Sequence, residues 1–298
     1  MNLPQVLQHT LAGSAACAGQ GVHSGATVRI VIRPASINTG IVFVRTDVTD
    51  RDNRVPVSAE TVGRTQLNTE IANAEGVAVS TIEHLMAAFA ALEVDNAVVE
   101  IDGPEVPIMD GSALPFVQLI DRAGRRVQDA PRRYIEILDT VEVVEGDKRA
   151  ALSPAASLEV DFEIAFASKA IGRQRVSLAV DEQVFRKELA AARTFGFVHE
   201  VEALRAKGLA IGGGLENAVV IDGDRILNPE GLRFADEFVR HKALDAIGDL
   251  YVLGLPVLGR FEGRYAGHAI NNRLVRALMA TPAAWRTRTL ASEMAEAV

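Results

Sequence analysis

His241 and Asp245, two residues with metal-binding side chains, lie four positions apart in the segment 238–249. Residues at this spacing lie one above the other on a helix, so both side chains would project from one helix face, with Asp249 a turn further along. An imidazole and a carboxylate in this arrangement can bind one metal ion. The same spacing also suits an ordinary His/Asp pair on a solvated helix face, which is the more common case. Spacing alone therefore does not establish a metal site.

Glu83 and His84 are a second set of candidate groups, at the start of another predicted helix. The sequence from Ser80 to Glu83 has the S-x-x-E form of a helix capping box, followed by apolar residues at helical spacing. The positive end of the helix dipole favours the neutral imidazole that a metal requires. His84, His241 and Asp245 would supply the three protein ligands that catalytic zinc commonly takes, leaving the fourth position to water. Glu83 would accept the proton of that water. Alternatively, Glu83 is only the capping carboxylate that bonds back to Ser80.

His268 is the third candidate histidine. It follows Gly267 and precedes two amides, Asn271 and Asn272, which predicts a loop edge. A histidine in this setting could protonate a leaving amine as a general acid. A histidine in such a stretch is more often structural, and this alternative stays open.

The remaining histidines and one glycine run carry weaker signals. We expect His9 and His199 to be surface residues, and His23 to be held in a glycine-flanked turn. The glycines at 212–214 could cradle a phosphate, but they lack the Lys and Ser/Thr of a phosphate-binding loop. A flexible turn is the better interpretation of this run.

The elements that must position these groups are mixed strands and helices. In the first half, alternation and turn residues predict strands at 26–33, 41–45 and 96–101 and helices behind the capping box and at 115–123. In the second half, we expect strands within 134–144 and 157–166, a turn at 145–147, and helices at about 181–192 and 234–252. No regular βαβ alternation appears, which favours an α+β fold of layered sandwiches.

The chain length of 298 residues, about twice a typical ~150-residue domain, predicts two domains. We place the boundary in the charged segment 125–133, with domains at 1–128 and 132–280. The tail 281–298 has a run of Ala, Arg and Thr that indicates partial disorder.

The composition excludes several classes of protein. Hydrophobic residues make up 48% and charged residues 23%, which is ordinary globular usage and rules out disorder for most of the chain. The net charge is -8 and the basic residues are scattered, so we expect no nucleic-acid partner. Cys17 is the single cysteine and cannot form an internal disulfide, which fits a reducing cytosol. The N-terminus lacks a secretory signal and no segment is long enough to span a membrane, so we expect a cytoplasmic protein.

Six segments of the chain resemble one known family, the UDP-3-O-acyl-N-acetylglucosamine deacetylases, which are the zinc enzymes of lipid A synthesis in Gram-negative bacteria. Each segment alone is modest, but six in family order over nearly the whole chain are highly specific. They are GVHSG at 21–25, STIEHL at 80–85, PIMDGS at 107–112, ARTFGF at 192–197, the segment 238–249, and GHA at 267–269.

The resemblance implies two similar two-layer α+β domains with the active site between them. It assigns zinc to His84, His241 and Asp245, the base to Glu83 and the acid to His268, in agreement with the interpretation above. It further implies that Asp249 orients or charge-stabilises His268. Lys242 and Thr194 would stabilise the oxyanion formed as water adds to the acetamide.

The resemblance also implies an acylated UDP-sugar substrate. An insert at about 195–220 would form an apolar passage for the acyl chain, Phe166 would stack near the uracil, and Lys148 would approach the phosphates. The chain departs from the family at Arg264-Tyr265-Ala266, where we expect a lysine, so a phosphate contact there would have to come from Arg264. The full expected substrate-binding set is His23, Lys148, Phe166, Phe195, Phe197, Ile211 and Gly213.

Three points stay open at the level of the sequence. The apolar stripe of the insert also suits an ordinary core, and a His/His/Asp site also accepts Fe(II) in place of Zn²⁺. The substrate could be another N-acylated sugar nucleotide, or the protein could be a silent binder with a structural metal. We expect a monomer.

Overall fold

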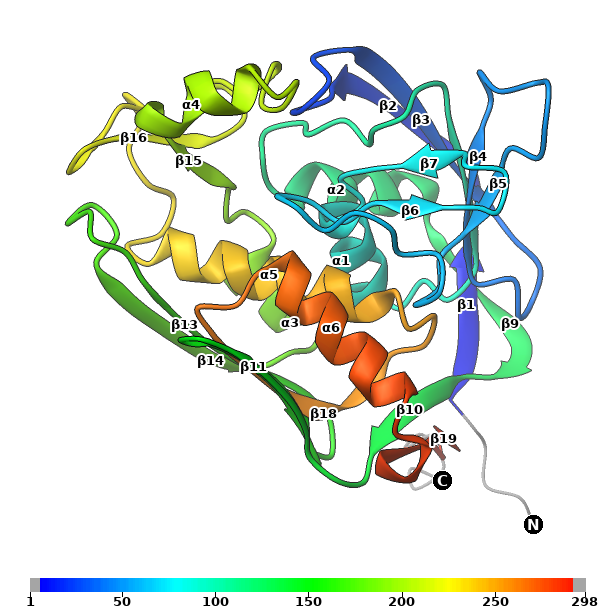
Figure 1. The fold of residues 1–298 in the computed structure, drawn as a ribbon. Coiled ribbons are helices and arrows are strands. Elements are labelled where there is room, and N and C mark those ends of the chain that lie inside the picture. Colours follow the sequence, from blue (N-terminus) through cyan, green and yellow to red (C-terminus); the bar gives the residue numbers. More distant parts are fainter. Residues whose placement is uncertain (1–5, 292–298) are drawn as a thin grey trace.

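A computed structural model describes residues 6–291, in which strands and helices are mixed without regular alternation. Two large sheets form the outer sides, and the long helices lie between them (Figure 1). The expected α+β class is therefore confirmed. No helix of the described range 6–291 is both long and apolar enough to cross a membrane.

The N-terminal sheet has five strands and carries its helices on one face. Two helices accompany it, α1 (Glu83–Ala91) and α2 (Leu114–Ala123), and α2 packs on β2 and β3. Gly124, with a φ of 68°, ends α2 as the sequence predicts. The strand order is β2 (Ala15–Gln20), β3 (Thr27–Pro34), β8 (Ala97–Ile101), β4 (Ile41–Arg45) and β5 (Arg54–Pro56), with a separate small pair, β6 (Ile71–Ala72) and β7 (Ala78–Val79).

The C-terminal sheet has seven strands and is covered by two further helices. Helix α5 (Glu237–Tyr251) packs on β13 and β14, and α6 (His268–Met279) packs on β11 and β12. The strands are β10 (Arg133–Ile137), β11 (Val141–Glu145), β12 (Lys148–Ser153), β13 (Leu158–Ala165), β14 (Arg173–Ala179), β18 (Val257–Arg264) and β19 (Trp285–Thr289).

The two halves share a common arrangement around one central strand. In the first half β8 lies between α1 and α2 in the chain, and in the second half β18 lies between α5 and α6. Each central strand pairs antiparallel with one neighbour (β3 or β12) and parallel with another (β4 or β13), and β18 also pairs parallel with β10. Each half is thus a sheet with a helical layer, as expected for two similar sandwiches.

Several elements differ from the expectations. The charged segment 125–133, where we place the domain boundary, contains a strand that the sequence does not predict, since β9 (Arg125–Pro131) pairs with β1 (Leu7–Leu11). The helix expected at about 181–192 is shorter, with α3 (Glu182–Val184) continued without a break by a π-helical turn at Phe185–Leu189. Within the tail, Trp285–Thr289 forms β19, which pairs with β10. Residues 292–298 lie outside the described range, so partial disorder of the tail stays a prediction. The division into 1–128 and 132–280 stays a prediction.

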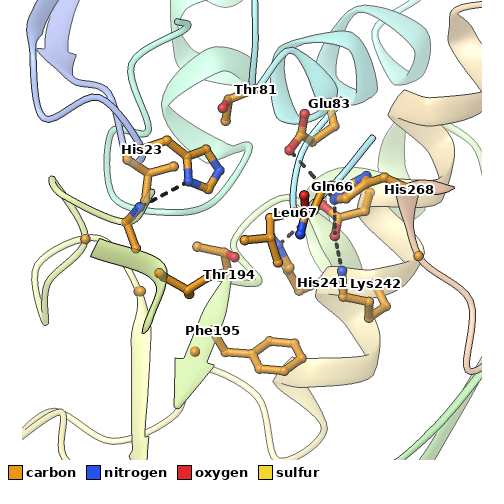
Figure 2. Close-up of a pocket in the computed structure, with 18 of the residues that line it drawn as sticks. His23, Gln66, Leu67, Thr81, Glu83, Thr194, Phe195, His241, Lys242 and His268 are labelled. Carbon is orange, nitrogen blue, oxygen red and sulfur yellow. Dashed lines mark hydrogen bonds and ion pairs between the residues drawn. The ribbon is translucent and has the colours of Figure 1, made fainter. Parts of the chain in front are cut away.

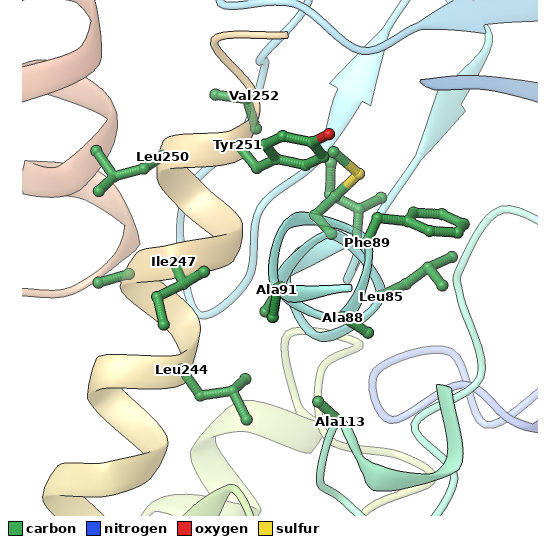
Figure 3. Packing of buried hydrophobic residues seen from close by; sticks show 14 of the residues in the cluster. Leu85, Ala88, Phe89, Ala91, Ala113, Leu244, Ile247, Leu250, Tyr251 and Val252 are labelled. Atoms are coloured by element: carbon green, nitrogen blue, oxygen red, sulfur yellow. The ribbon is translucent and has the colours of Figure 1, made fainter. Parts of the chain in front are cut away.

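Helices α1 and α5 make the main contact between the two halves. Figure 3 shows α1 seen nearly along its axis beside α5, with Ala91 on the side of α1 nearest α5, Phe89 on the opposite side, and Leu244 and Ile247 on α5. All four side chains are buried in one continuous core. This contact holds the start of α1 at a fixed place beside the middle of α5.

Gly248 makes that close approach feasible. A Cβ atom built on Gly248 would lie 2.0 Å from the backbone oxygen of Glu83, and backbone cannot move aside as a flexible side chain can. Glycine at this position therefore sets the distance between the two helices that carry the candidate catalytic groups.

We expect Gly248→Ala to lower the free energy of unfolding by about 1–3 kcal/mol, the usual cost of overpacking, and to reduce activity by displacing α1. Thermal unfolding and a turnover assay measure the two effects. Gly13→Ala is the matched control, because its Cβ would meet only Ala123 O at an ordinary 3.6 Å. Equal stability of the Gly248 and Gly13 variants would contradict the role of the close contact.

Candidate metal centre and active site

The start of α1 differs from the predicted capping box. The backbone N–H and the hydroxyl of Ser80 both donate to Pro104 O, at 2.9 and 3.1 Å. The Glu83 carboxylate instead accepts from the backbone N–H of Thr69, at 3.0 Å, and no side chain caps the helix. Glu83 therefore does not cap the helix. One carboxylate oxygen, Oε2, accepts from Thr69, and the other, Oε1, faces His268.

His84, His241 and Asp245 converge as the sequence predicts. Among the described residues they are the one group of three or more His, Cys, Asp and Glu side chains whose ligand atoms all lie within 4.8 Å of one another. The Nε2 atoms of His84 and His241 lie 3.4 and 3.3 Å from Asp245 Oδ1. All three side chains are buried. Because α1 supplies one ligand and α5 the other two, the site spans the contact between the halves.

The protonation of these groups matches a cation site. Burial lowers the pKa of His241 to about 3, so its ring is neutral at neutral pH. Ala192 O lies 3.0 Å from His241 Nδ1 and can only accept, so the proton lies on Nδ1 and a lone pair on Nε2. Burial raises the pKa of Asp245, but His241 and Lys242 outweigh it and hold the pKa well below its usual value.

The lone pair on His241 Nε2 and the charged Asp245 Oδ1 repel each other at this distance unless a cation lies between them. Within the described part of the chain, Asp245 Oδ1 and His84 Nδ1 are also buried without a hydrogen-bond partner. Two imidazoles and one carboxylate are the donor set of a catalytic zinc site. The residues present therefore fit a metal ion.

Glu83 and His268 flank this group. Glu83 Oε1 and Asp245 Oδ2 each lie 3.8 Å from His268 Nε2. On the other side of the ring, His268 Nδ1 lies 2.9 Å from Asp249 Oδ2. Burial lowers the pKa of His268, but the carboxylates of Asp249 and Glu83 outweigh it and raise the pKa to about 9. Burial also raises the pKa of Glu83.

These positions place a basic carboxylate and a protonated imidazole beside the candidate metal site formed by His84, His241 and Asp245. His268 is not at a loop edge as expected, but is the first residue of α6. The unpredicted helix fixes the ring more firmly than a loop would. Asp249 lies on α5 one turn beyond Asp245, as the spacing predicts.

Lys242 and Thr194 are the two residues expected to stabilise an oxyanion. Lys242 Nζ donates to Asp245 Oδ2 at 2.6 Å, and this carboxylate outweighs burial to raise the lysine pKa. Thr194 is held by its backbone, whose N–H donates to Gly111 O and whose O accepts from Val219 N, both at 2.8 Å. Both residues line the same cavity as the metal group (Figure 2).

That cavity has a volume of about 500 Å³ and reaches from the metal group to the predicted insert. Figure 2 shows Glu83, His241 and His268 close together, with His23 and Phe195 at the periphery. Ile211 is not among the lining residues, since it packs towards Gly25 with half its surface exposed. The expected substrate residues that do line the cavity are His23, Lys148, Phe166, Phe195, Phe197 and Gly213.

The insert is a small β-α-β unit on the rim of the cavity. Strands β15 (Phe195–Phe197) and β16 (Val219–Asp222) pair in parallel and are linked by α4 (Val198–Arg205), with β17 (Arg225–Ile226) beside β16. No residue of α4 is buried, so its apolar side chains are not an ordinary core. Val201 and Leu204 of α4 line the cavity instead.

The three remaining histidines, His9, His23 and His199, differ in their exposure and surroundings. His199 is exposed, as expected. His9 is half-buried in β1, and burial lowers its pKa, so the expected surface position is wrong. His23 lies in the glycine-flanked turn, where Glu105 accepts from its backbone N–H at 2.9 Å.

The sequence did not reveal several residues of the site. Arg264 does not line the cavity, and its guanidinium lies 5.0 Å over the Tyr265 ring. Arg273 on α6 does line it and pairs with Glu145. No local sequence pattern indicates Arg273, because the sequence does not predict helix α6. The other residues that were missed are Gln66, Leu67, Thr69 and Asn271.

Comparisons with known proteins agree with this geometry. The sequence model of the family described as UDP-3-O-acyl N-acetylglycosamine deacetylase matches residues 8–280. A UDP-3-O-acyl-N-acetylglucosamine deacetylase of Phenylobacterium zucineum (strain HLK1) is 69% identical over 293 residues, which cover 98% of this chain and 100% of that protein. Proteins of the same name from Shewanella sp. (strain W3-18-1) and Shewanella oneidensis are each 50% identical over 282 residues, covering 94% of this chain and 92% of theirs.

Proposed function

Since this chain belongs to the UDP-3-O-acyl-N-acetylglucosamine deacetylase family, we propose that it hydrolyses the acetamide of its acylated UDP-sugar at a zinc ion held by His84, His241 and Asp245. The deacetylation itself, a step of lipid A biosynthesis, follows from the family. The observation that carries the metal proposal is the neutral His241 ring facing Asp245 Oδ1 at 3.3 Å.

The metal would supply Lewis acidity when bound, polarising a carbonyl oxygen and lowering the pKa of water. The ligand set favours Zn²⁺, and Fe²⁺ is the alternative that it also accepts. The monomeric state and the cytoplasmic location stay predictions.

Glu83 and His268 move the protons in this proposal. As water adds to the acetamide carbon, Glu83 takes a proton from it, and as the C–N bond breaks, His268 gives a proton to the departing nitrogen. The products are acetate and the free amine of the sugar. Asp249 holds the Nδ1 side of His268, so that Nε2 faces the reacting groups.

Lys242 and Thr194 stabilise the negative charge that forms on the carbonyl oxygen. A raised pKa keeps Lys242 charged, and its contact with Asp245 fixes the ammonium near the ligand set. Preorganised donors of this kind act without reorganising during the reaction.

The rest of the cavity fits the two ends of the substrate. The unburied apolar side chains of α4 and β15 suit an acyl chain, which gains from leaving water. Phe166, Lys148 and His23 are assigned to the nucleotide and sugar end. We assign the phosphate contact expected of Arg264 to Arg273, which lines the cavity.

Replacing Arg273 by alanine is expected to raise KM for the UDP-linked substrate about tenfold, the value of one charge-assisted hydrogen bond. The kcat value should change little, since the lost interaction is ground-state binding. Arg264→Ala is the matched control and should leave both constants near those of wild type. Steady-state kinetics on both variants decides, and an unchanged KM for Arg273→Ala would refute the assignment.

Activity is expected to follow a bell-shaped pH profile. Glu83 must be deprotonated to act as a base, so the rate falls as the pH drops through its raised pKa. His268 must be protonated to act as an acid, so the rate falls as the pH rises through about 9. Asp249→Asn removes the first of the charges that raise the pKa of His268, so the alkaline limb should move to lower pH. An alkaline limb that stays in place would contradict the assignment of His268 as the acid.

The direct test of the proposed function compares two substrates. Release of acetate should be rapid from UDP-3-O-acyl-N-acetylglucosamine and slow from the unacylated UDP-N-acetylglucosamine, because the α4 surface is then unused. Equal rates on both would mean that the acyl chain is not recognised. No acetate from either would refute the deacetylase assignment.

A further inference from the structure

Thr69 contacts both the candidate base and the partner of the candidate acid. It lies in the loop before β6, and its side chain is buried. Its backbone N–H donates to Glu83 Oε2 at 3.0 Å, and its hydroxyl donates to Asp249 Oδ1 at 2.6 Å. Thr69 thus donates hydrogen bonds to a carboxylate on α1, that of Glu83, and to a carboxylate on α5, that of Asp249.

The Asp249 carboxylate is held from three directions. Thr69 donates to Oδ1, Asn271 Nδ2 donates to Oδ2 at 2.9 Å, and His268 Nδ1 lies 3.1 and 2.9 Å from the two oxygens. The carboxylate plane, and with it the direction of the imidazole, depends on these donors. A carboxylate with one donor removed can rotate, and the His268 ring would rotate with it.

The Thr69 backbone has a matching role at Glu83. By binding Oε2, it leaves Oε1 on the side of His268 Nε2, 3.8 Å away. The loop is itself fixed, because Thr69 O accepts from Ile82 N at 3.3 Å and the neighbouring Asn68 donates to Thr81 Oγ1 at 3.0 Å. The base and the acid therefore share one rigid support.

We propose that Thr69 is a positioning residue for this reaction: its hydroxyl orients Asp249 and through it His268, while its backbone N–H orients Glu83. This inference rests on the proposed function for its kinetic consequence. The contacts themselves do not depend on the substrate. Thr69 touches none of the three metal ligands in the hydrogen bonds of the described chain, so metal binding should not depend on its hydroxyl.

Thr69→Val tests the hydroxyl, because valine keeps the shape and removes the donor. We expect kcat to fall about tenfold to a hundredfold, as for other supporting partners of a site, with KM and metal content unchanged. Thr69→Ser keeps the donor and should restore most of kcat. Thr10→Val is the matched control, since Thr10 is also a buried threonine, with its hydroxyl bonded to Asn96 O outside the site. Its kcat should equal that of wild type.

A double-mutant cycle with Asp249→Asn shows whether Thr69 acts through Asp249. If it does, Thr69→Val adds little further loss once Asp249 is replaced. A full second loss in the double variant, or equal damage by serine and valine, would overturn the proposal in favour of a packing role. An unchanged kcat in Thr69→Val would overturn it as well.

A readout without substrate separates this inference from the proposed function. The proton on His268 Nδ1 gives a low-field NMR signal while it is bonded to Asp249. In Thr69→Val we expect that signal to shift or to exchange faster with water, and in Thr69→Ser and Thr10→Val to stay as in wild type. An unmoved signal in Thr69→Val refutes the positioning role even if the wild-type protein releases no acetate, which would refute the proposed function alone.

Discussion

Replacing Glu83 by glutamine is expected to lower kcat for deacetylation by about 10² to 10⁴-fold, the usual contribution of a positioned general base. The amide oxygen of glutamine can still accept from Thr69 N–H, so the side chain keeps its place but cannot take a proton. The free energy of unfolding of Glu83→Gln should not fall below that of wild type. Because burial raises the pKa of Glu83, its charged form is less favourable in the folded protein than in the unfolded chain at neutral pH, and a neutral amide removes that cost.

The comparison of turnover with thermal unfolding therefore isolates the chemistry. We expect a large loss of kcat with an unfolding temperature at least equal to that of wild type. Glu75→Gln, at an exposed turn position, is the control and should leave both unchanged. A Glu83→Gln variant within tenfold of wild type would show that another group is the base.

The second large effect is expected from His241→Ala, which removes a metal ligand from the middle of α5. We expect bound metal to fall to near zero and activity to fall at least about 10³-fold, since the lowered pKa of water is lost with the ion. The variant also leaves Ala192 O without its donor. Metal analysis and an acetate-release assay on the same sample measure both.

His9→Ala is the control for loss of a histidine. His9 lies half-buried in β1, and its ring Nδ1 is a buried atom without a hydrogen-bond partner among the described residues, so its removal should change neither metal content nor turnover. Retention of full metal content by His241→Ala would mean that the ion binds elsewhere.

The convergence of His84, His241 and Asp245 is predicted by signals that are local in the sequence. His241 and Asp245 share one helix at i and i+4, and the apolar pattern behind Ser80 places His84 at a helix start. The folding of the two helices against each other then brings the ligands together, which two separate sequence patterns cannot show. Gly248 permits this close contact. A single glycine within a predicted helix does not by itself indicate that another helix lies against it.

The parts that could not be predicted depend on contacts between distant segments. Thr69 meets Asp249 across 180 positions of the chain, and nothing in its own neighbourhood indicates this. The capping box predicted at Ser80–Glu83 is wrong for the same reason. The backbone N–H and the hydroxyl of Ser80 both donate to Pro104 O, so a tertiary contact replaces the local hydrogen bonds. The sequence does not predict α6, because a histidine directly after Gly267 and before two amides is typical of a loop edge.

Metal dependence is tested most directly by measuring metal content and acetate release on one preparation through chelation and re-addition of zinc. We expect about one metal ion per chain, loss of activity as the chelator removes it, and recovery when Zn²⁺ is restored. His241→Ala should show no recovery. Full acetate release by wild-type protein from which all metal has been removed would show that the reaction does not need the proposed ion.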